Sequence, residues 1–363
     1  MHTISLCMIV KNEESVLGGC LGSIHDLCDE IIILDTGSSD GTKEIAEQYT
    51  DKVYDFKWID DFSAARNAAF AKATKNYILW LDADDILLEA DREKFKEMKE
   101  NLTDAVDAVS MFYYTAFDEY GNPTFKFRRN RLVKRSNQFK WHGPVHEYLA
   151  VGGHILFSDI GITHRKHEKE AASVASDRNL KIYENRLKKG EKFTPRDLFY
   201  YANELKDHRK YHKAIMYYDE FLGTRQGWVE DEIRACIYSA DCYKNLGNQV
   251  KERAALAASI QYDVPRPEVS CRFGDYYKNE KQYKKALIWY ELALKPDAND
   301  EHGFNLAMYS TWYPHLQLCV CYWQLGDMQK AAAHNEQAKK FRPDDDRIQY
   351  NEKFFKELKA KRK

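Results

Sequence analysis

The sequence has no long apolar run, no paired-cysteine motif and almost no net charge. Its first apolar stretch, residues 4–10, is too short for a signal peptide or a membrane span, so we expect a cytoplasmic protein without a membrane-spanning helix. A net charge of −2 over 363 residues gives no global attraction to nucleic acid, which we do not expect as a partner, although residues 126–140 are locally basic. None of the eight cysteines has Cys-x-x-Cys spacing, which favours reduced thiols over disulfides or zinc sites.

The residues that are present divide the chain into two parts. Up to about residue 165, short apolar strands alternate with helical stretches, which favours a layered α/β domain. From about residue 173 the pattern is that of amphipathic helices. We therefore predict an α/β domain over residues 1–172 and an all-helical domain over residues 173–363. The expected strands are 4–10, 30–34, 52–54, 77–81 and 108–114, and the expected helices lie near 14–25, 41–50, 62–74 and 91–100.

The helical part repeats one template, in which small residues mark helix crossings, an aromatic residue follows one turn away and a proline closes the unit. Copies occur at residues 198–218, 271–296 and 319–343, and they resemble tetratricopeptide repeats. The closing prolines Pro265, Pro296 and Pro343 are 31 and 47 residues apart, so at least one unit carries an insertion. Such a solenoid is either a scaffold or a concave surface that holds a peptide or a partner protein.

Two strands of the α/β part run directly into carboxylates. Asp35 ends one strand, and Asp82, Asp84 and Asp85 follow another that is apolar throughout. A strand of that kind is buried on both faces of a largely parallel sheet, and its carboxyl end lies where open α/β sheets bind ligands. Three acids in four residues repel one another without a cation. We therefore expect a divalent metal ion that is shared with a substrate phosphate, as Mg²⁺ or Mn²⁺ commonly is.

Other polar residues accompany these strand ends. Asp35 is a candidate for a ribose or base contact, whereas Asp40 or Ser39 is as readily the cap of the following helix. Arg66 falls in the first turns of a helix, where it either neutralises a phosphate or lies on a solvated face. Arg131 belongs to a group of arginines that either holds a diphosphate or forms a basic surface.

In order and spacing, four motifs resemble the family 2 glycosyltransferases of the GT-A fold, over roughly residues 3–165. They are Val-Lys-Asn-Glu at 10–13, Asp-x-Gly-Ser-x-Asp-Gly-Thr at 35–42, Asp-Phe-Ser-x-x-Arg-Asn at 61–67 and Asp-x-Asp at 82–84. The resemblance implies a UDP-sugar donor and a divalent metal held by Asp84, Asp82 and His164, with Asp85 assisting. The residues that it assigns to the nucleotide sugar are Val10, Asn12, Glu13, Asp35, Arg66, Asp82, Ala83 and Arg131.

The run Gly-Pro-Val-His-Glu at 143–147 looks like the acceptor-side element of the same family. On that resemblance Glu147 is the general base that an inverting transfer requires, and His146 either orients the acceptor or takes that role itself. The alternative is that Glu147 caps a helix or pairs with a cation. His164 is either a metal or phosphate contact, as the resemblance implies, or a structural histidine.

A GT-A domain followed by tetratricopeptide-like helices is similar to bacterial peptide S-glycosyltransferases of the sublancin glycosyltransferase type. That resemblance implies transfer of a hexose to a cysteine, serine or threonine of a peptide or protein. In broad outline the chain is also similar to transferases of lipopolysaccharide core and other surface glycans. A third interpretation, from a different class, is a noncatalytic repeat adaptor with a degenerate transferase domain. We also expect a homodimer, since helical solenoids often self-associate.

Overall fold

A computed structural model describes residues 2–119, 121, 123–165, 177–295 and 305–361. The chain forms two compact units, Met1–Tyr200 and Tyr201–Lys363. The domain boundary predicted at residues 172 and 173 lies outside the described residues. No helix of the described part is long and apolar enough to cross a membrane.

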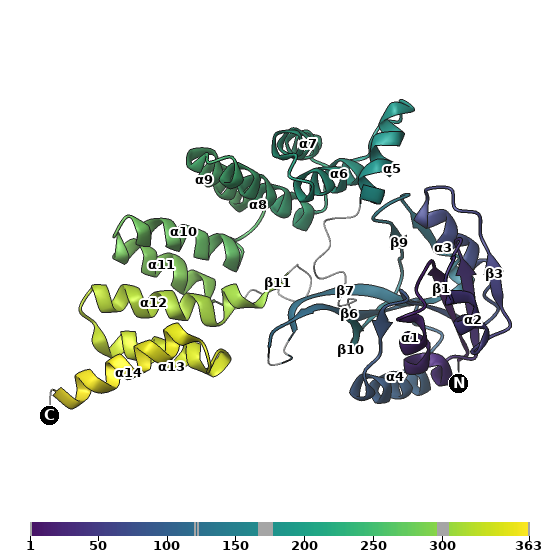
Figure 1. Ribbon diagram of the computed structural model, residues 1–363, viewed down its shortest axis with the longest axis horizontal. Helices are drawn as coiled ribbons and strands as arrows, with labels where there is room; N and C mark the ends of the chain where they lie inside the picture. The colour runs from purple at the N-terminus through teal and green to yellow at the C-terminus, as the bar shows by residue number, and fades with distance from the viewer. Residues whose placement is uncertain (1, 120, 122, 166–176, 296–304, 362–363) are drawn as a thin grey trace. The chain divides into compact units, whose positions relative to one another are not determined.

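The first unit is built on a mixed sheet with strand order β3-β2-β1-β4-β7-β6-β10-β5 (Figure 1). Strands β1, β2, β3 and β4 are parallel to one another, whereas β7 is antiparallel to both β4 and β6. The parallel half therefore brings the ends of β1, β2 and β4 to one edge. The bounds are β1 (Ile4–Val10), β2 (Glu30–Asp35), β3 (Val53–Asp55), β4 (Tyr77–Trp80), β5 (Asp85–Ile86), β6 (Ala108–Phe117), β7 (Pro123–Lys134) and β10 (Ile155–His164).

Helices cover both faces of this sheet, because alternate side chains of the central strands point to opposite sides. On β1, Leu6 and Met8 pack in one core with α1 (Leu17–Ile24), α2 (Thr42–Glu47) and α4 (Glu89–Asn101). Cys7 of β1 packs in the other core, against the alanines of α3 (Phe62–Phe70). A separate hairpin, β8 (Lys140–His142) with β9 (Tyr148–Ala150), lies beside α3 through Asn67, which bonds the backbone of Trp141.

The edge of the sheet opposite the ends of β1 and β4 contains a buried carboxylate, Glu30 at the start of β2. Lys52 Nζ lies 2.6 Å from its Oε1, and Thr74 donates to it from its backbone nitrogen and its hydroxyl. Ser5 donates a further hydrogen bond. Burial alone would raise the pKa of Glu30, but these partners together lower it to about 2 from the ordinary 4.5.

Because the folded-state pKa of Glu30 is depressed, its charge stabilises the fold above pH 4.5, and this contribution is lost as the pH falls towards 2. We expect Glu30→Gln to lower the free energy of unfolding by about 2–3 kcal/mol at pH 7 and by progressively less between pH 4.5 and 2. Urea unfolding curves at pH 7, 4 and 3 measure the difference. Glu47→Gln, at an exposed glutamate of α2, is the control and should change little.

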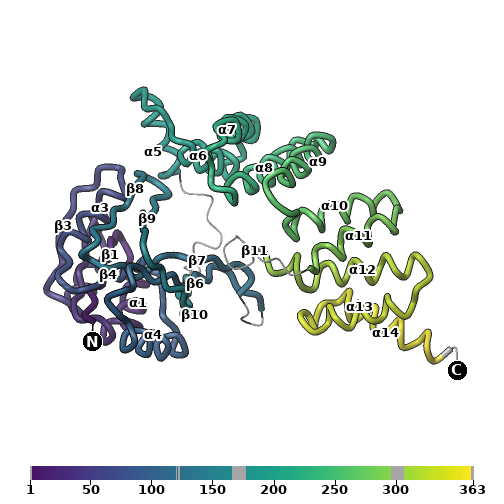
Figure 2. Tube along the Cα trace, turned by 180° about the vertical axis from the view of Figure 1, so that it is seen from behind, coloured from purple at the N-terminus to yellow at the C-terminus, as the bar shows by residue number. Residues whose placement is uncertain are grey.

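The second unit consists of stacked helix pairs (Figure 2). Among the described residues, four helix–turn–helix pairs, α6–α7, α8–α9, α10–α11 and α12–α13, are followed by α14, and the division between the two units falls within α6. The bounds are α6 (Pro195–Asp207), α7 (Tyr211–Thr224), α8 (Val229–Asn245), α9 (Gln249–Ala258), α10 (Pro267–Asn279), α11 (Tyr283–Ala293), α12 (Trp312–Gln324), α13 (Met328–Phe341) and α14 (Asp346–Lys361).

Small residues allow the paired helices to approach closely, as the repeat template predicts. Gly274 of α10 faces the ring of Tyr290 on α11, and a Cβ at that position would lie 2.5 Å from the ring. The Tyr290 hydroxyl donates to Asp275, which also accepts from Tyr313 of α12 and so joins two pairs. The prediction that at least one unit carries an insertion rests on the 47 residues between Pro296 and Pro343, of which 296–304 lie outside the described part of the chain.

The pair α8–α9 was not predicted. The second helix of each of the other pairs has a buried alanine at its fourth position, such as Ala214 in α7 or Ala286 in α11. At the same position α9 has Glu252. This buried carboxylate accepts from Arg272 of α10 at 2.9 Å. The template was missed because a buried ion pair has replaced the small residue that defines it.

Candidate active site

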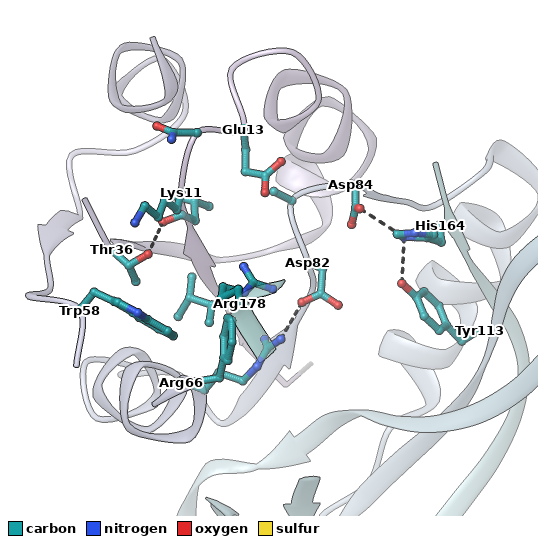
Figure 3. A pocket seen from close by; sticks show the side chains of 15 residues that line it. Lys11, Glu13, Thr36, Trp58, Arg66, Asp82, Asp84, Tyr113, His164 and Arg178 are labelled. Carbon is teal, nitrogen blue, oxygen red and sulfur yellow. Dashed lines mark hydrogen bonds and ion pairs between the residues drawn. The ribbon is translucent and has the colours of Figure 1, made fainter. Parts of the chain in front are cut away.

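A cavity of about 510 Å³ opens at the edge where β1, β2 and β4 end. Figure 3 shows that residues from all three strand ends point into it, joined by side chains from α3, β6, β10 and α5 (Asp177–Lys188). Its volume suits a cofactor-sized or substrate-sized molecule. The lining residues are Ile9, Val10, Lys11, Asn12, Glu13, Thr36, Trp58, Phe62, Arg66, Asp82, Ala83, Asp84, Tyr113, His164 and Arg178.

Arg66 connects two carboxylates at this edge. Its Nη2 lies 2.7 Å from Asp82 Oδ1, and its Nε lies 2.6 Å from Glu147 Oε1. The guanidinium carbon also lies close to two indole rings that contact each other edge to face, 4.9 Å from the centre of the Trp80 ring and 4.7 Å from that of Trp141. Burial alone would raise the pKa of Asp82, but Arg66 outweighs this effect and the pKa of Asp82 is well below its ordinary value. Asp82 is therefore an anion at neutral pH.

A second group consists of Asp84, Asp85 and His164, whose candidate ligand atoms lie within 4.8 Å of one another. Strand pairing produces the group, because β5 runs antiparallel to β10 and places Asp85 opposite His164. His164 Nδ1 lies 3.4 Å from Asp84 Oδ2 and 3.1 Å from the Tyr113 hydroxyl. The hydrogen bond to Asp84 raises the pKa of His164.

These residues fit a divalent cation. The two carboxylates supply the hard oxygen ligands that Mn²⁺ and Mg²⁺ prefer, and the imidazole of His164 adds one nitrogen ligand. Asp85 is fully buried, and its Oδ1 has no hydrogen-bond partner within the described residues. Burial raises the pKa of Asp85 to about 6, although Arg131 opposes the shift. Asp82, predicted as a ligand, lies outside this group and faces Arg66 instead.

Arg131 is not among the residues that line the cavity. It is fully buried, 3.0 Å from Asp85 Oδ2, and its guanidinium stacks 4.0 Å from the Trp80 ring and 4.5 Å from the Tyr113 ring. In this position it balances the charge of Asp85. The predicted diphosphate contact therefore has no geometric support at Arg131.

Of the other residues predicted to contact the nucleotide, four line the cavity and Asp35 does not. Val10, Asn12, Glu13 and Ala83 line the cavity. Asp35 does not, because it is 1% exposed and its carboxylate accepts from the backbone of Gly37 and Ser38, which closes the turn after β2. Thr36 takes the position at the cavity wall.

Glu147 and His146 follow the hairpin strand β8 and also lie outside the cavity lining. Glu147 is mostly buried, and its Oε1 lies 2.6 Å from Nε of Arg66, which lines the cavity. His146 adopts a left-handed backbone conformation with φ of 49°, and its ring stacks 4.5 Å from the ring of Tyr200. Arg196 donates to the His146 carbonyl at 3.0 Å. The predicted roles of both residues stay predictions.

Seven residues that line the cavity were not predicted as site residues: Ile9, Lys11, Thr36, Trp58, Phe62, Tyr113 and Arg178. Trp58 and Phe62 are adjacent aromatic rings, 4.7 Å apart, next to the motif that contains Arg66. Tyr113 lies mid-strand among apolar residues, where no local signal separates it from the core. Arg178 is 94 residues from Asp84 in the sequence, so spacing alone gives no reason to pair them.

The sequence of the first unit is similar to those of known glycosyltransferases. Residues 5–159 match the sequence model of Glycosyl transferase family 2. A TPR repeat-containing protein of Synechococcus elongatus is 40% identical over 149 residues, 41% of this chain and 36% of that protein. The SPbeta prophage-derived glycosyltransferase SunS of Bacillus subtilis is 30% identical over 224 residues, 59% of this chain and 52% of that protein.

A third relative is the lipopolysaccharide core biosynthesis glycosyltransferase LpsC of Rhizobium meliloti, 28% identical over 159 residues, which are 42% of this chain and 58% of LpsC. The chain thus spans about a third to somewhat over half of the length of these relatives. The family match and the sheet described above confirm the expected GT-A fold for the first unit. Residues 5–159 are the part of the chain that is similar to Glycosyl transferase family 2.

Proposed function

We propose that the chain is an inverting, metal-dependent glycosyltransferase that moves a hexose from a UDP-sugar to a peptide or protein side chain, in the cytoplasm. The observation that carries this proposal is that Asp84 and His164, two members of the candidate metal group, face the same cavity as the ends of β1 and β2. Metal-assisted leaving of a nucleotide requires a cation site next to a nucleotide site.

In this proposal Asp84, Asp85 and His164 hold the metal ion. When bound, a divalent cation there offsets the negative charge of the departing nucleoside diphosphate. Val10, Asn12, Glu13 and Ala83 form the wall against which the nucleotide lies, and Asp35 acts by fixing the turn that carries Thr36. Arg66 keeps Asp82 ionised and oriented.

We assign Glu147 as the general base that removes the proton of the acceptor nucleophile. Arg66 Nε orients its Oε1, and the same guanidinium contacts Asp82 at the cavity wall. One side chain therefore fixes a donor-side and an acceptor-side carboxylate, which favours attack from the side opposite the leaving group. His146 is assigned a positioning role, since its ring stacks on Tyr200.

The acceptor class rests on the second unit and on the relatives. A stack of helix pairs supplies an extended surface suited to a peptide, and one relative is described as repeat-containing. A surface glycan is the second candidate, because LpsC is described as a lipopolysaccharide core transferase. We place the boundary between catalytic and repeat domains at residues 172 and 173, and propose a homodimer.

The test is incubation of the purified chain with a panel of UDP-sugars and Mn²⁺, with free UDP measured. We expect UDP release with at least one sugar and its loss on addition of EDTA. Mass spectrometry of added peptides and of oligosaccharides separates the two acceptor classes by which one gains a hexose mass. A chain that neither releases UDP nor shows a donor-induced thermal shift would be a noncatalytic adaptor instead.

A further inference from the structure

Arg178 lines the cavity at the ends of β1, β2 and β4, which is named the donor cavity because the proposed function places the UDP-sugar there. This arginine does not belong to the residues that match the family. It lies in the first turn of α5, whereas the match ends at residue 159. Its side chain is exposed and lines the cavity (Figure 3). Its guanidinium carbon lies 4.7 Å from the centre of the Phe62 ring. Stacking of this kind restricts a long side chain to one region at low cost.

The charges around the cavity show why this cation matters. Three carboxylates line the wall, those of Glu13, Asp82 and Asp84, together with the cations Lys11, Arg66 and Arg178. The charge of Arg66 is shared by Asp82 and Glu147, and its atoms are buried. A diphosphate that binds against this wall therefore needs a further hydrogen-bond donor, one whose charged group is exposed.

The buried arginine next to the site does not meet this need. Arg131 is fully enclosed and paired with Asp85, so it has no route to a ligand in the cavity. Arg178 differs from it in being exposed at the cavity wall, and a guanidinium can offer two parallel N–H groups to phosphate oxygens. Lys11 lies in the loop after β1 and provides a point charge without that geometry.

We infer that Arg178 is the diphosphate-binding arginine of the donor cavity, with a nucleoside diphosphate as the chemical class that it recognises. This inference rests on the proposed function. The contact with the diphosphate, which the family resemblance assigns to Arg131, is thereby assigned to a residue of α5. Nucleotide binding then depends on residues on both sides of the end of the family match.

A neighbouring cavity of about 480 Å³ provides a matched control. It is lined by Arg178 and, one turn further along α5, by Lys181, which does not line the donor cavity. Lys181 is a cation on the same helix, exposed in the same way and paired with Asp177 at 3.5 Å. Its replacement changes the net charge of α5 as much as replacement of Arg178 does, without touching the donor cavity.

The experiment is calorimetric titration of the full chain with UDP and with uridine, both in the presence of Mn²⁺. We expect Arg178→Ala to weaken UDP binding by about 10- to 100-fold and to leave uridine binding unchanged, because only UDP carries phosphates. Arg178→Lys should give an intermediate loss, since it retains the charge without the fork. Lys181→Ala should bind UDP as the unaltered chain does.

The outcomes separate this inference from the proposed function. UDP binding by Arg178→Ala within threefold of the unaltered chain would overturn the assignment while leaving the proposed function intact. An equal loss of UDP and uridine binding would also overturn it, because Arg178 would then act only through packing on Phe62. Absence of UDP binding by the unaltered chain would overturn the proposed function and this assignment with it. Matching thermal midpoints show that each variant is folded.

Discussion

Replacement of Asp84 by asparagine is expected to lower transfer from a UDP-sugar by about 10³-fold or more. Asp84 is the member of the candidate metal group that both lines the donor cavity and contacts His164. Asparagine retains the shape of the side chain but removes its negative charge, so the cation loses its main charged ligand on the cavity wall. The fold is expected to be unaffected, because Asp84 is only partly buried.

Two measurements test this expectation independently. Initial rates of UDP release report on turnover, and the Mn²⁺ signal in electron paramagnetic resonance reports on the fraction of metal bound without any turnover. Asp55→Asn is the control, since Asp55 is an exposed aspartate at the end of β3 that pairs with Lys43 and does not line the cavity. Metal binding by Asp84→Asn equal to that of the unaltered chain would remove Asp84 from the metal site.

Replacement of Glu147 by glutamine is expected to lower transfer to the acceptor by about 10²- to 10⁴-fold, the usual contribution of a general base. Glutamine has the same shape, and its carbonyl oxygen can still accept the hydrogen bond from Arg66 Nε. UDP-sugar binding should therefore change little. The loss is expected in kcat, because a base acts in the chemical step and not in donor binding.

The alternative for Glu147 is that it serves only as an ion-pair partner of Arg66. In that case Glu147→Gln would weaken donor binding and lower the thermal midpoint together, because Arg66 would lose one of its two carboxylates. Donor affinity from calorimetry and transfer rates measured on the same preparation distinguish these outcomes. Full transfer activity with normal donor affinity would disprove the base assignment.

The parallel half of the sheet was predictable from the sequence because its strands are continuous apolar runs. The expected strand at residues 4–10 is β1, and the one at 77–81 is β4 with one residue fewer. Runs of this kind are buried on both faces, and burial depends on local composition. The carboxylates that follow them were predicted at the correct edge for the same reason.

The antiparallel half was not fully predictable, because its strands carry charges. β7 contains Arg128, Arg129 and Arg131 and was interpreted as a basic stretch. In the fold these guanidiniums lie over aromatic rings, and Arg131 is neutralised by Asp85. Apart from Phe127, these rings and the acid belong to segments that are distant in sequence. The pattern of charges in a sequence indicates which side chains are exposed only where the residues that pair with those charges are close in sequence.

The pairings within the candidate site depend on distant contacts in the same way. The sequence predicts that Asp82, Asp84 and His164 are important, and the structure brings Asp84 and His164 together. It also gives two neighbouring acids different nearest cations, since Asp82 lies 2.7 Å from Arg66 and 4.0 Å from Arg131, while Asp85 lies 3.0 Å from Arg131. These pairings depend on the positions of α3, which carries Arg66, and of β7, which carries Arg131, and they are not encoded in the four-residue motif itself.

Because β5 pairs with β10, replacing only the matched segment 5–159 with that of a relative would separate two members of the candidate metal group. Asp85 and His164 are opposite each other in the sheet, yet the family match ends at residue 159, before the histidine. A recombination event at the end of the recognisable family sequence would give a chimera with the acids of one parent and the histidine of the other. The candidate metal group therefore extends beyond the segment that matches the family model.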